Sequence, residues 1–563
     1  MDFLVSRSGP QLDTVIERYD TSYRVGEFWL GHVSSGNLEV LEDTPDTQTV
    51  AAGSLYGPLS DLTDLRGRSK EDLGARALES DGSFALAHLQ GSTITVVTDA
   101  GGSIPVYYGD GPRGLALGTV VHHVAACSGL TSLDEVSVVD YLLNANVCYP
   151  YSWYEKVRLA PPGSVCSFDV SDEKTTYTYW EPTEPDDVCD PCDVRKWGER
   201  LRKQISSAVE QSIQDKKNGK LLYSGGSDSR AILSVVPRSF DCTPTTILDR
   251  KNREYKLAKR SANLLGRRLD WIRRPENFYR SGVSDRIDTI GPGRDFQHTH
   301  VFGSVASQLE RTDVILGGYF SDTILKTLYM SNVERRPYKP EQLSEPMPDT
   351  IKERNFMEDI SDIFIDRLVE KVQTRREKHH AYLKEIRPFT AGNWHNLWPA
   401  SGGLEFGSYM ATTRLETEII EPFVFSQTYK LAAMMPDTAR IDSRGFRQAF
   451  SEKMGSAGFW PTSSGRIPRF GGKLGHEVMR QIKRWRTLKE RLGIEAGYQG
   501  SWSPDRLRSA PVRPEDHFDG ASCNLLYDRL QGILSGVGPR QFFEMSGHRQ
   551  AQVRSLSLGF SVS

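Results

Sequence analysis

Short apolar runs separated by glycine and aspartate dominate the first part of the chain. Residues 84–88 (Phe-Ala-Leu-Ala-His) and 93–98 (Thr-Ile-Thr-Val-Val-Thr) are examples, and the second run is rich in β-branched residues. Runs of this length and composition are typical of strands. The pattern therefore predicts a β-rich region from residue 1 to about residue 180.

The pattern changes after residues 181–193 (EPTEPDDVCDPCD), which hold three prolines and six acidic residues and are typical of a linker. Beyond them, runs with helical spacing alternate with short apolar runs. The predicted elements are a helix from residue 194, a strand over 221–223, a helix over 230–235, a strand over 245–248, a helix over 254–265 and a strand over 314–316. This alternation indicates an α/β fold with a parallel sheet and helices on both of its faces. Beyond about residue 350 we expect mostly helix.

A chain of 563 residues is longer than one hydrophobic core supports, so we expect two or three domains. The linker divides the chain into residues 1–185 and 194–563, which we predict as two domains. Charged residues make up 25% and hydrophobic residues 38%, which is ordinary for a soluble globular protein. The formal net charge of −3 gives no indication of a nucleic-acid or membrane surface. One basic stretch, residues 256–268, lies in a helical pattern and is interpreted as a solvated face.

Cysteine usage and the N-terminal residues bear on location. The seven cysteines are odd in number and scattered, which suits a reducing compartment rather than a disulfide framework. Cys189 and Cys192 form one C-x-x-C, but no second ligand pair at matching spacing accompanies them. The start MDFLVSRSGP lacks the features of a signal peptide, and no apolar stretch approaches the roughly 20 residues that span a bilayer. We expect a cytoplasmic protein.

The sharpest chemical signal is the turn SGGSDS, residues 224–229, between a predicted strand and a predicted helix. Gly225 and Gly226 let the backbone approach a ligand without a Cβ in the way, and the helix N-terminus offers N–H groups to an anion. The hydroxyls of Ser224 and Ser229 add donors, so the turn predicts a pyrophosphate cradle. The Asp228 carboxylate would repel phosphate unless a hard cation lies between them, which implies Mg²⁺.

This turn resembles the signature of the N-type ATP pyrophosphatases, which cleave ATP between its α- and β-phosphates. Within that group the chain is similar to the asparagine synthetase family over nearly its whole length. The ordered segments that match the family's motifs are 81–85 (DGSFA), 99–108 (DAGGSIPVYY), 161–163 (PPG), 179–180 (YW), 254–262 and 317–322 (GGYFSD). The resemblance implies an N-terminal αββα sandwich of the Ntn-hydrolase type, followed by a parallel-sheet ATP-pyrophosphatase domain with extra helices.

The resemblance also implies a set of ligands. Asp228 and Asp322 would bind Mg²⁺ bridging the ATP phosphates, residues 225–229 would hold pyrophosphate, and Leu248 with Gly317-Gly318 would hold the adenosine part. Two carboxylates so far apart in sequence are reasonable metal partners only if they follow neighbouring parallel strands, at the carboxyl edge of the sheet.

One departure from the family concerns glutamine. Glutamine-dependent members expose a catalytic cysteine as their first mature residue, with its α-amine as base. Here position 2 is Asp2, the first cysteine is Cys127, and residues 52–57 (AGSLYG) replace the family's N-G-E-I-Y-N. The first domain is therefore expected to be degenerate, as a structural relic or a partner surface.

A second departure is Tyr319, where ammonia-using synthetases carry glutamate. Tyrosine at this position resembles the β-lactam and carbapenam synthetases, in which a Tyr–Glu pair deprotonates the attacking amine. A phenol of pKa about 10 needs a carboxylate partner to act as a base. Glu405 is the candidate, with Glu416 and Glu418 as alternatives. The other interpretation of Tyr319 is packing beside the nucleotide.

The related synthetases also use a lysine, in R-P-K-x-G, to stabilise developing negative charge. Here Arg469 aligns with that lysine, and Lys473 on the following loop is the alternative. Arg230, just after the phosphate turn, would meet an anionic substrate or form an ion pair on its helix. His298 and His300 share one face if their segment is a strand, but no third metal ligand accompanies them at a defined spacing.

These residues together predict an AMP-forming carbon–nitrogen ligase that uses ATP and Mg²⁺ to adenylate a carboxylate and transfer it to an amine. The amine would lie in the same molecule, giving a lactam or macrolactam as in β-lactam synthetases and lasso-peptide cyclases, or in a second substrate. The expected partners are a small-molecule or peptide carboxylate and an amine, without nucleic acid or membrane, and a homodimer or partner protein is compatible with the sequence. The alternatives are an ammonia-dependent amidating enzyme and a nucleotide-binding scaffold without turnover.

Overall fold

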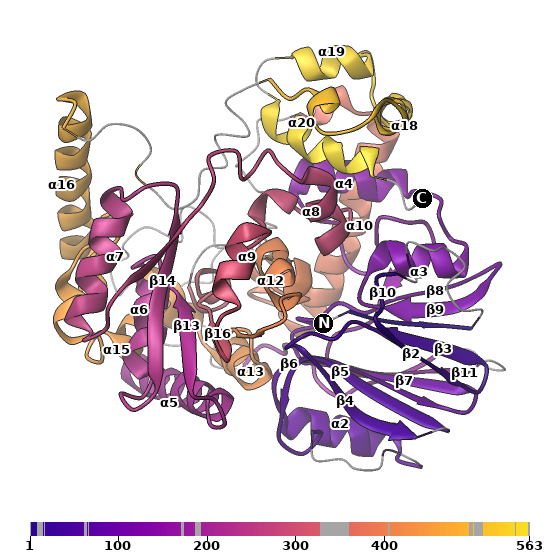
Figure 1. Ribbon diagram of the computed structural model, residues 1–563, viewed down its shortest axis with the longest axis horizontal. Coiled ribbons are helices and arrows are strands. Elements are labelled where there is room, and N and C mark those ends of the chain that lie inside the picture. The colour runs from indigo at the N-terminus through magenta and orange to yellow at the C-terminus, as the bar shows by residue number, and fades with distance from the viewer. Residues whose placement is uncertain are drawn as a thin grey trace.

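The computed structural model describes residues 2–7, 15, 17–44, 46–60, 65, 67–169, 174–185, 193–326, 360–402, 406–494, 499, 511–545 and 548–560. Its strands form two six-stranded antiparallel sheets and one five-stranded parallel sheet. The antiparallel sheets use the strands up to residue 178, and the parallel sheet uses those from residue 218 onward. Figure 1 shows the two groups side by side, the antiparallel sheets in indigo and the parallel sheet in magenta.

The N-terminal half is built in four layers. The first sheet has the order β10 (Arg158–Leu159), β8 (Tyr107–Gly111), β9 (Gly114–Gly118), β1 (Phe3–Ser6), β3 (Phe28–His32) and β2 (Thr21–Val25). The second has the order β12 (Thr175–Thr178), β11 (Ser164–Asp169), β7 (Thr93–Thr98), β6 (Asp81–Gln90), β5 (Thr47–Tyr56) and β4 (Leu38–Thr44). Helix α3 (Val121–Ser128) covers the first sheet and α2 (Lys70–Glu79) covers the second.

Strand β6 explains why both faces of the second sheet are buried. Successive side chains of a strand point to opposite faces. Phe84 and Leu86 pack with the apolar side of α2, whereas Ala85 and Ala87 pack into the core shared with the first sheet. The near-continuous apolar run of the sequence is thus a doubly covered strand.

The C-terminal half is organised by the parallel sheet, whose strand order is β15 (Asp270–Arg273), β14 (Asp241–Leu248), β13 (Asn218–Leu222), β16 (Val314–Leu316) and β17 (Glu418–Ile420). Val314 and Leu316 face the core that contains α5 (Val194–Ser212), α6 (Ser227–Val235) and α7 (Arg253–Leu264). Ile315 between them faces a second cluster, which includes Val305 and Leu309 of α9 (Ser304–Leu309). Helical segments therefore cover both faces of this sheet.

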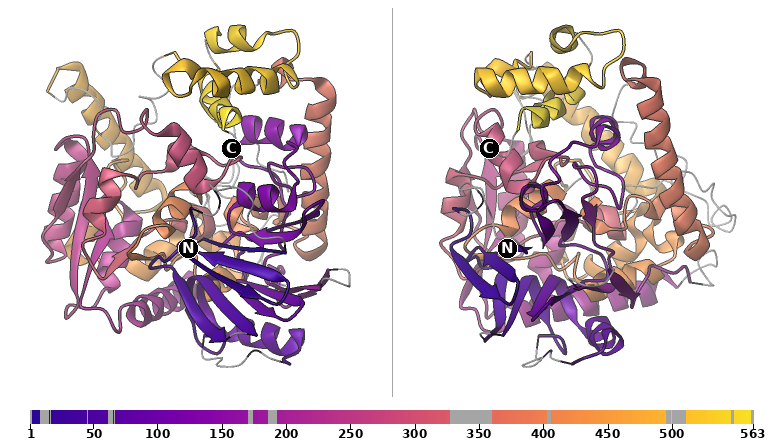
Figure 2. Two further views of the ribbon diagram at one scale, coloured as in Figure 1. Left: turned by 45° about the vertical axis from the view of Figure 1, so that its right-hand side comes forward. Right: turned by 90° about the vertical axis from the view of Figure 1, so that its right-hand side faces the viewer.

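Further helices surround the sheets. Those that follow the parallel strands are α8 (Val283–Ile290), α10 (Asp366–Ile386), α11 (Ala391–Trp394), α12 (Phe406–Thr413), α13 (Ser426–Met434), α14 (Asp437–Arg440) and α15 (Arg444–Phe450). The last described part holds α16 (Gly472–Arg491), α18 (Gly520–Gln531), α19 (Pro539–Glu544) and α20 (Arg549–Ser555). Figures 1 and 2 show α18–α20 above α4 (Glu135–Asn144), with α16 standing apart at the other end of the molecule. None of the helices in the described residues is both long and apolar enough to cross a membrane.

The expected fold class is confirmed: an αββα sandwich is followed by a parallel-sheet half with extra helices. Two strands of the parallel sheet, β15 and β17, were not predicted from the sequence. The basic face was predicted correctly, since Lys256, Lys259 and Arg260 of α7 are exposed. Residues 186–192 of the expected linker lie outside the described residues, so the boundary between 185 and 194 stays a prediction.

Candidate active site

The phosphate turn and Asp322 lie at the same edge of the parallel sheet. Strands β13 and β16 are neighbours and run parallel, with Leu221 opposite Leu316. Residues 224–229 follow β13 and Asp322 follows β16, so both are at the carboxyl edge, where such sheets bind ligands. Asp228 and Asp322 therefore follow neighbouring parallel strands, as two ligands of one cation would have to.

The turn itself depends on Gly225. Its φ is +70°, in the left-handed region that favours glycine, and a Cβ there would lie 2.8 Å from the Cα of Ala258 on α7. The next residue, Gly226, is the N-cap of α6, and its N–H donates to the Oγ of Ser224 at 3.2 Å. Close packing of α7 thus fixes the turn, and the N-terminus of α6 opens toward the sheet edge.

Lys326 joins the two predicted metal ligands. Its Nζ donates to the Oδ1 of Asp322 at 2.8 Å, to the Oδ1 of Asp228, and to the Oγ of Ser227 at 3.1 Å. The Lys326 side chain is buried, whereas that of Asp322 is half-exposed. The sequence analysis missed this lysine, although its spacing of four residues from Asp322 is that of one helical turn, and residues 321–325 do form a π-helical turn.

The electrostatics of this trio favour a cation between two carboxylates. Burial alone would lower the pKa of Lys326, but Asp228 and Asp322 together raise it. The positive charge of Lys326 lowers the pKa of Asp322, and burial raises that of Asp228. Since both carboxylates converge on one cationic group, the donor set also fits the Mg²⁺ that the family resemblance implies.

A cavity of ≈ 280 Å³ lies beside the trio, over the ends of β13, β14 and β16. The hydroxyls of Ser229 and Thr246 line it, and both are buried with no hydrogen-bond partner among the described residues. Buried hydroxyls normally find a partner, so these two are candidate donors to a ligand.

The predicted adenosine contacts are only partly at this cavity. Gly318 lines it. Leu248 is fully buried, and its carbonyl accepts from the backbone N–H of Arg274 at 3.0 Å. A Cβ on Gly317 would lie 1.7 Å from the Oε1 of Glu421, so Gly317 is needed for close packing against that carboxylate.

Arg274 and His300 line this cavity, and Tyr279 links them. Arg274 donates to the hydroxyl of Tyr279 at 2.6 Å, and that hydroxyl lies 3.1 Å from the Nδ1 of His300. Burial lowers the pKa of His300 well below its ordinary range, so its imidazole is neutral near pH 7. His298 ends a 3₁₀ turn rather than lying in a strand, and its ring centroid is 5.8 Å from that of His300.

A second cavity of ≈ 310 Å³ shares Ser224, Asp228 and Asp322 with the first. Its lining holds three basic side chains, Lys326, Arg447 and Arg466, and three carboxylates, Asp228, Asp322 and Asp442. Its rim includes Asp442 and Ser443, both with positive φ, a conformation that costs energy for residues other than glycine and often occurs at functional sites. The two cavities thus meet at the carboxylates that Lys326 joins.

The predicted catalytic cations lie outside this lining. Arg469 is exposed and stacks over the ring of Phe459 at 4.8 Å, and Lys473 is exposed in the first turn of α16. The cation from that loop that does line the cavity is Arg466, whose charge lowers the pKa of Asp322. Alignment with the family motif could not tell which side chains of the loop turn inward.

Arg230 takes neither of its expected roles. It is fully buried and donates to the carbonyls of Ala457 at 2.8 Å and Pro461 at 3.0 Å. It therefore ties α6, which begins at the phosphate turn, to the segment that leads into the Arg466 loop.

Tyr319 lines the first cavity, and its backbone N–H donates to the Oε2 of Glu421 at 2.9 Å. Glu405 lies outside the described residues. Glu416 precedes β17, and Glu418 is its first residue. Both therefore lie at the amino edge of the sheet, opposite the carboxyl edge that holds the phosphate turn. Glu418 forms an ion pair there with Lys216 at 2.9 Å. Sequence reasoning missed Glu421, although it belongs to the same segment as Glu418.

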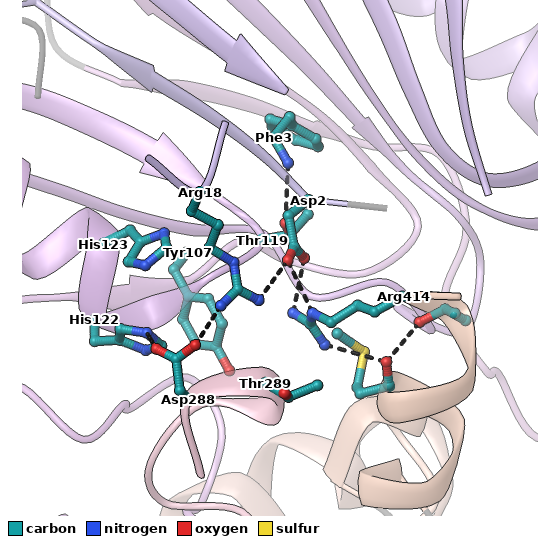
Figure 3. Close-up of polar contacts among 12 residues, drawn as sticks. Asp2, Phe3, Arg18, Tyr107, Thr119, His122, His123, Asp288, Thr289 and Arg414 are labelled. Atoms are coloured by element: carbon teal, nitrogen blue, oxygen red, sulfur yellow. Dashed lines mark hydrogen bonds and ion pairs between the residues drawn. The ribbon is translucent and has the colours of Figure 1, made fainter. Parts of the chain in front are cut away.

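The position expected for the glutaminase nucleophile is filled by an ion-pair cluster. The Asp2 carboxylate is 98% buried and lies 2.8 Å from the guanidinium of Arg414 and 2.8 Å from that of Arg18. Arg18 also pairs with Asp288, whose other oxygen lies 3.1 Å from the Nε2 of His122 (Figure 3). Because Arg414 belongs to the segment after α12, the cluster joins the two halves of the chain.

No family model matches this chain. No curated protein matches it either.

Several solved structures align with it in part. The allosteric regulatory enzyme of purine biosynthesis aligns at 10% identity over 48% of this chain and 74% of its own, with a TM-score of 0.22. The glutamine phosphoribosylpyrophosphate amidotransferase from B. subtilis aligns at 10% identity over 56% and 68%, with a TM-score of 0.20. The NH3-dependent NAD synthetase from Campylobacter jejuni aligns at 14% identity over 37% and 97%, with a TM-score of 0.19. Likenesses with such low TM-scores carry no argument, so the chemistry of this chain rests on its own geometry.

Proposed function

We propose that this protein is an ATP-dependent ligase that adenylates a carboxylate, releases pyrophosphate and transfers the acyl group to an amine. One observation carries the proposal: the phosphate turn, Asp228 and Asp322 converge on one cationic side chain, that of Lys326, where the two cavities meet. The adenosine part would occupy the cavity lined by Thr246 and Gly318. The β- and γ-phosphates would lie toward the second cavity, which Arg447 and Arg466 line.

In the first step, a carboxylate oxygen attacks the α-phosphorus of ATP, and the bond from that phosphorus to the bridging oxygen of pyrophosphate breaks. Lys326 and Arg466, which line the second cavity, would stabilise the negative charge on the leaving group. Asp228 and Asp322 would hold Mg²⁺, which adds positive charge at the phosphates when it is bound. The N–H groups at the start of α6 and the hydroxyl of Ser229 would orient the phosphates.

In the second step, the amine nitrogen attacks the acyl carbon, AMP leaves, and the amine loses a proton. Tyr319 is our candidate for receiving that proton, since it lines the cavity where the acyl-adenylate would lie. A phenol needs a carboxylate partner for this work. Glu421, which already accepts the N–H of Tyr319, is the candidate among the described residues, and Glu405 outside them is the other.

The N-terminal half has no part in glutamine hydrolysis in this proposal. The Asp2 carboxylate is paired with two arginines, so position 2 offers neither a thiol nor space for a substrate amide. The amine is then supplied directly, within the carboxylate substrate or by a second molecule.

The decisive experiment is ATP–pyrophosphate exchange measured across a panel of carboxylic acids, with the Asp228→Asn variant as the blank. Exchange that depends on one acid, with AMP as the nucleotide product, would support the proposal. Formation of ADP alone, or no binding of ATP in the presence of Mg²⁺, would refute it. Mass spectrometry of the product then separates ring closure, which loses one water and gains no nitrogen, from transfer to an added amine or to ammonium.

A further inference from the structure

Three potential metal ligands from three separate segments converge away from the nucleotide site. Cys148 follows α4, His379 lies on α10, and His395 directly follows α11. One ligand atom of each lies within 4.8 Å of those of the other two, and all three residues are buried. Cys148 belongs to the half with antiparallel sheets and the two histidines to the other half, so the cluster spans the junction between them.

Each histidine has one buried ring nitrogen that is available to a ligand. The Nε2 of His395 lies 3.2 Å from the carbonyl oxygen of Arg376, to which it can only donate, so Nδ1 carries the lone pair in the neutral ring. This Nδ1 is buried with no hydrogen-bond partner among the described residues, and the same holds for the Nε2 of His379. A histidine oriented by a backbone carbonyl, with its other nitrogen facing inward, is the usual arrangement of a metal ligand.

The surroundings of the thiol suit a bound cation. The backbone N–H of Cys148 donates to Asp140 at 2.8 Å, which fixes the residue, while its thiol donates to the carbonyls of Tyr149 at 3.5 Å and Arg375 at 3.7 Å. The neighbouring guanidiniums are already paired: Arg375 with Asp134 at 2.8 Å, and Arg376 with Asp140 at 2.7 Å.

We propose that Cys148, His379 and His395 bind one Zn²⁺ ion, which joins the two halves of the chain. One sulfur and two imidazole nitrogens form a donor set that zinc favours. Zinc bonds of about 2.0–2.3 Å place tetrahedral ligands roughly 3.3–3.8 Å apart, so a small inward shift closes the site. When the Zn–S bond forms, the thiol proton leaves to solvent.

A fourth ligand is available as water. A cavity of ≈ 60 Å³ is lined by all three residues, and one water needs about 10–15 Å³ by this measure. The rival interpretation is a thiol packed beside two imidazoles with no ion, and metal analysis separates the two.

The test uses the full-length protein. Elemental analysis after exhaustive dialysis should find about one zinc per chain, and chelation followed by Co²⁺ should give the strong visible bands of tetrahedral cobalt with a thiolate-to-cobalt band in the near ultraviolet. Cys148→Ser should abolish the thiolate band, and His395→Ala should weaken zinc binding at least tenfold. Zinc should also raise the melting temperature of the metal-free wild type, since it binds the folded state.

Two control variants keep the assignment specific. Cys166→Ser alters another buried cysteine, which contacts the hydroxyl of Thr176 at 3.7 Å, and should leave metal binding unchanged. Cys189→Ser/Cys192→Ser removes the C-x-x-C and should also leave the thiolate band in place. The proposal is overturned if the wild type binds neither Zn²⁺ nor Co²⁺, or if the C-x-x-C variant alone loses the band. Should Cys148→Ser not fold, the wild type and these two variants still decide between the outcomes.

Discussion

The ammonium of Lys326 lies 2.8 Å from the Oδ1 of Asp322, and the same ammonium contacts the carboxylate of Asp228 on the neighbouring strand's loop. The lysine is 95% buried. A buried cation with two carboxylate partners is costly to remove, because it leaves two negative charges facing each other. The stability of the protein should therefore depend on whether a cation, either the Lys326 ammonium or a metal ion, lies between Asp228 and Asp322.

Lys326→Met should show this dependence. Without divalent metal, we expect the free energy of unfolding to fall by about 3–5 kcal/mol, the usual cost of breaking a buried ion pair. Mg²⁺ should restore much of this loss, because it binds the folded state of the variant, whereas it should change the wild type little. Thermal melting with and without Mg²⁺ measures both effects. Lys473→Met, at an exposed position of α16, is the matched control, and an equal response to Mg²⁺ in both proteins would contradict this dependence.

Arg466 and Arg469 should differ in their effect on exchange. Arg466 lines the second cavity, beside the phosphate turn, whereas Arg469 stacks on Phe459. We expect Arg466→Gln to lower the ATP–pyrophosphate exchange rate more than tenfold, since a tenfold loss corresponds to about 1.4 kcal/mol of transition-state stabilisation. Arg469→Gln should stay within roughly threefold of the wild type. If Arg469→Gln lowered the exchange rate more than Arg466→Gln, Arg469 would be the residue that stabilises the transition state.

The sequence predicted those parts of the candidate site that depend on backbone geometry. The turn from Ser224 to Ser229 needs glycine at a fixed place between strand and helix, and Asp322 follows a recognisable strand, so both could be predicted. Lys326 and Arg466 could not be singled out, because their role depends on which way a long side chain turns in a loop. Helical spacing from Asp322 was the one signal for Lys326.

The cluster of Cys148 with His379 and His395 lay beyond prediction for a different reason. Each of its residues comes from a different segment, and no spacing motif connects them. The packing of α10 against α4 and α11 brings them together. Long-range contacts of this kind leave no local pattern in a single sequence.

Gly225→Ala should damage the phosphate turn more than Gly226→Ala. Alanine at position 225 would have to adopt a φ of +70°, at a cost of about 1–2 kcal/mol, and its Cβ would lie 2.8 Å from the Cα of Ala258. At position 226 a Cβ would meet only the Oγ of Ser224, at 3.2 Å. We therefore expect a larger drop in melting temperature for Gly225→Ala, measured by circular dichroism. Equal melting temperatures for the two variants would argue against the close packing of α7 on the turn.

The Asp2 cluster gives a pH-dependent prediction. Burial alone would raise the pKa of Asp2, but Arg414 and Arg18 together hold it far below its ordinary range. A carboxyl whose pKa is lowered on folding stabilises the protein above its unfolded pKa of about 3.9, and this contribution is lost as the pH falls toward the folded pKa. Asp2→Asn should therefore lower the free energy of unfolding by about 3–5 kcal/mol near neutral pH. The difference in this free energy between the variant and the wild type should stay constant between about pH 7 and 5 and become smaller below about pH 4. Urea unfolding across this range measures the difference. The control is Asp366→Asn, at an exposed position, which should change the free energy of unfolding by less than about 0.5 kcal/mol. If the difference in free energy of unfolding between Asp2→Asn and the wild type became larger in acid, the buried ion pairs of Asp2 could not be its cause.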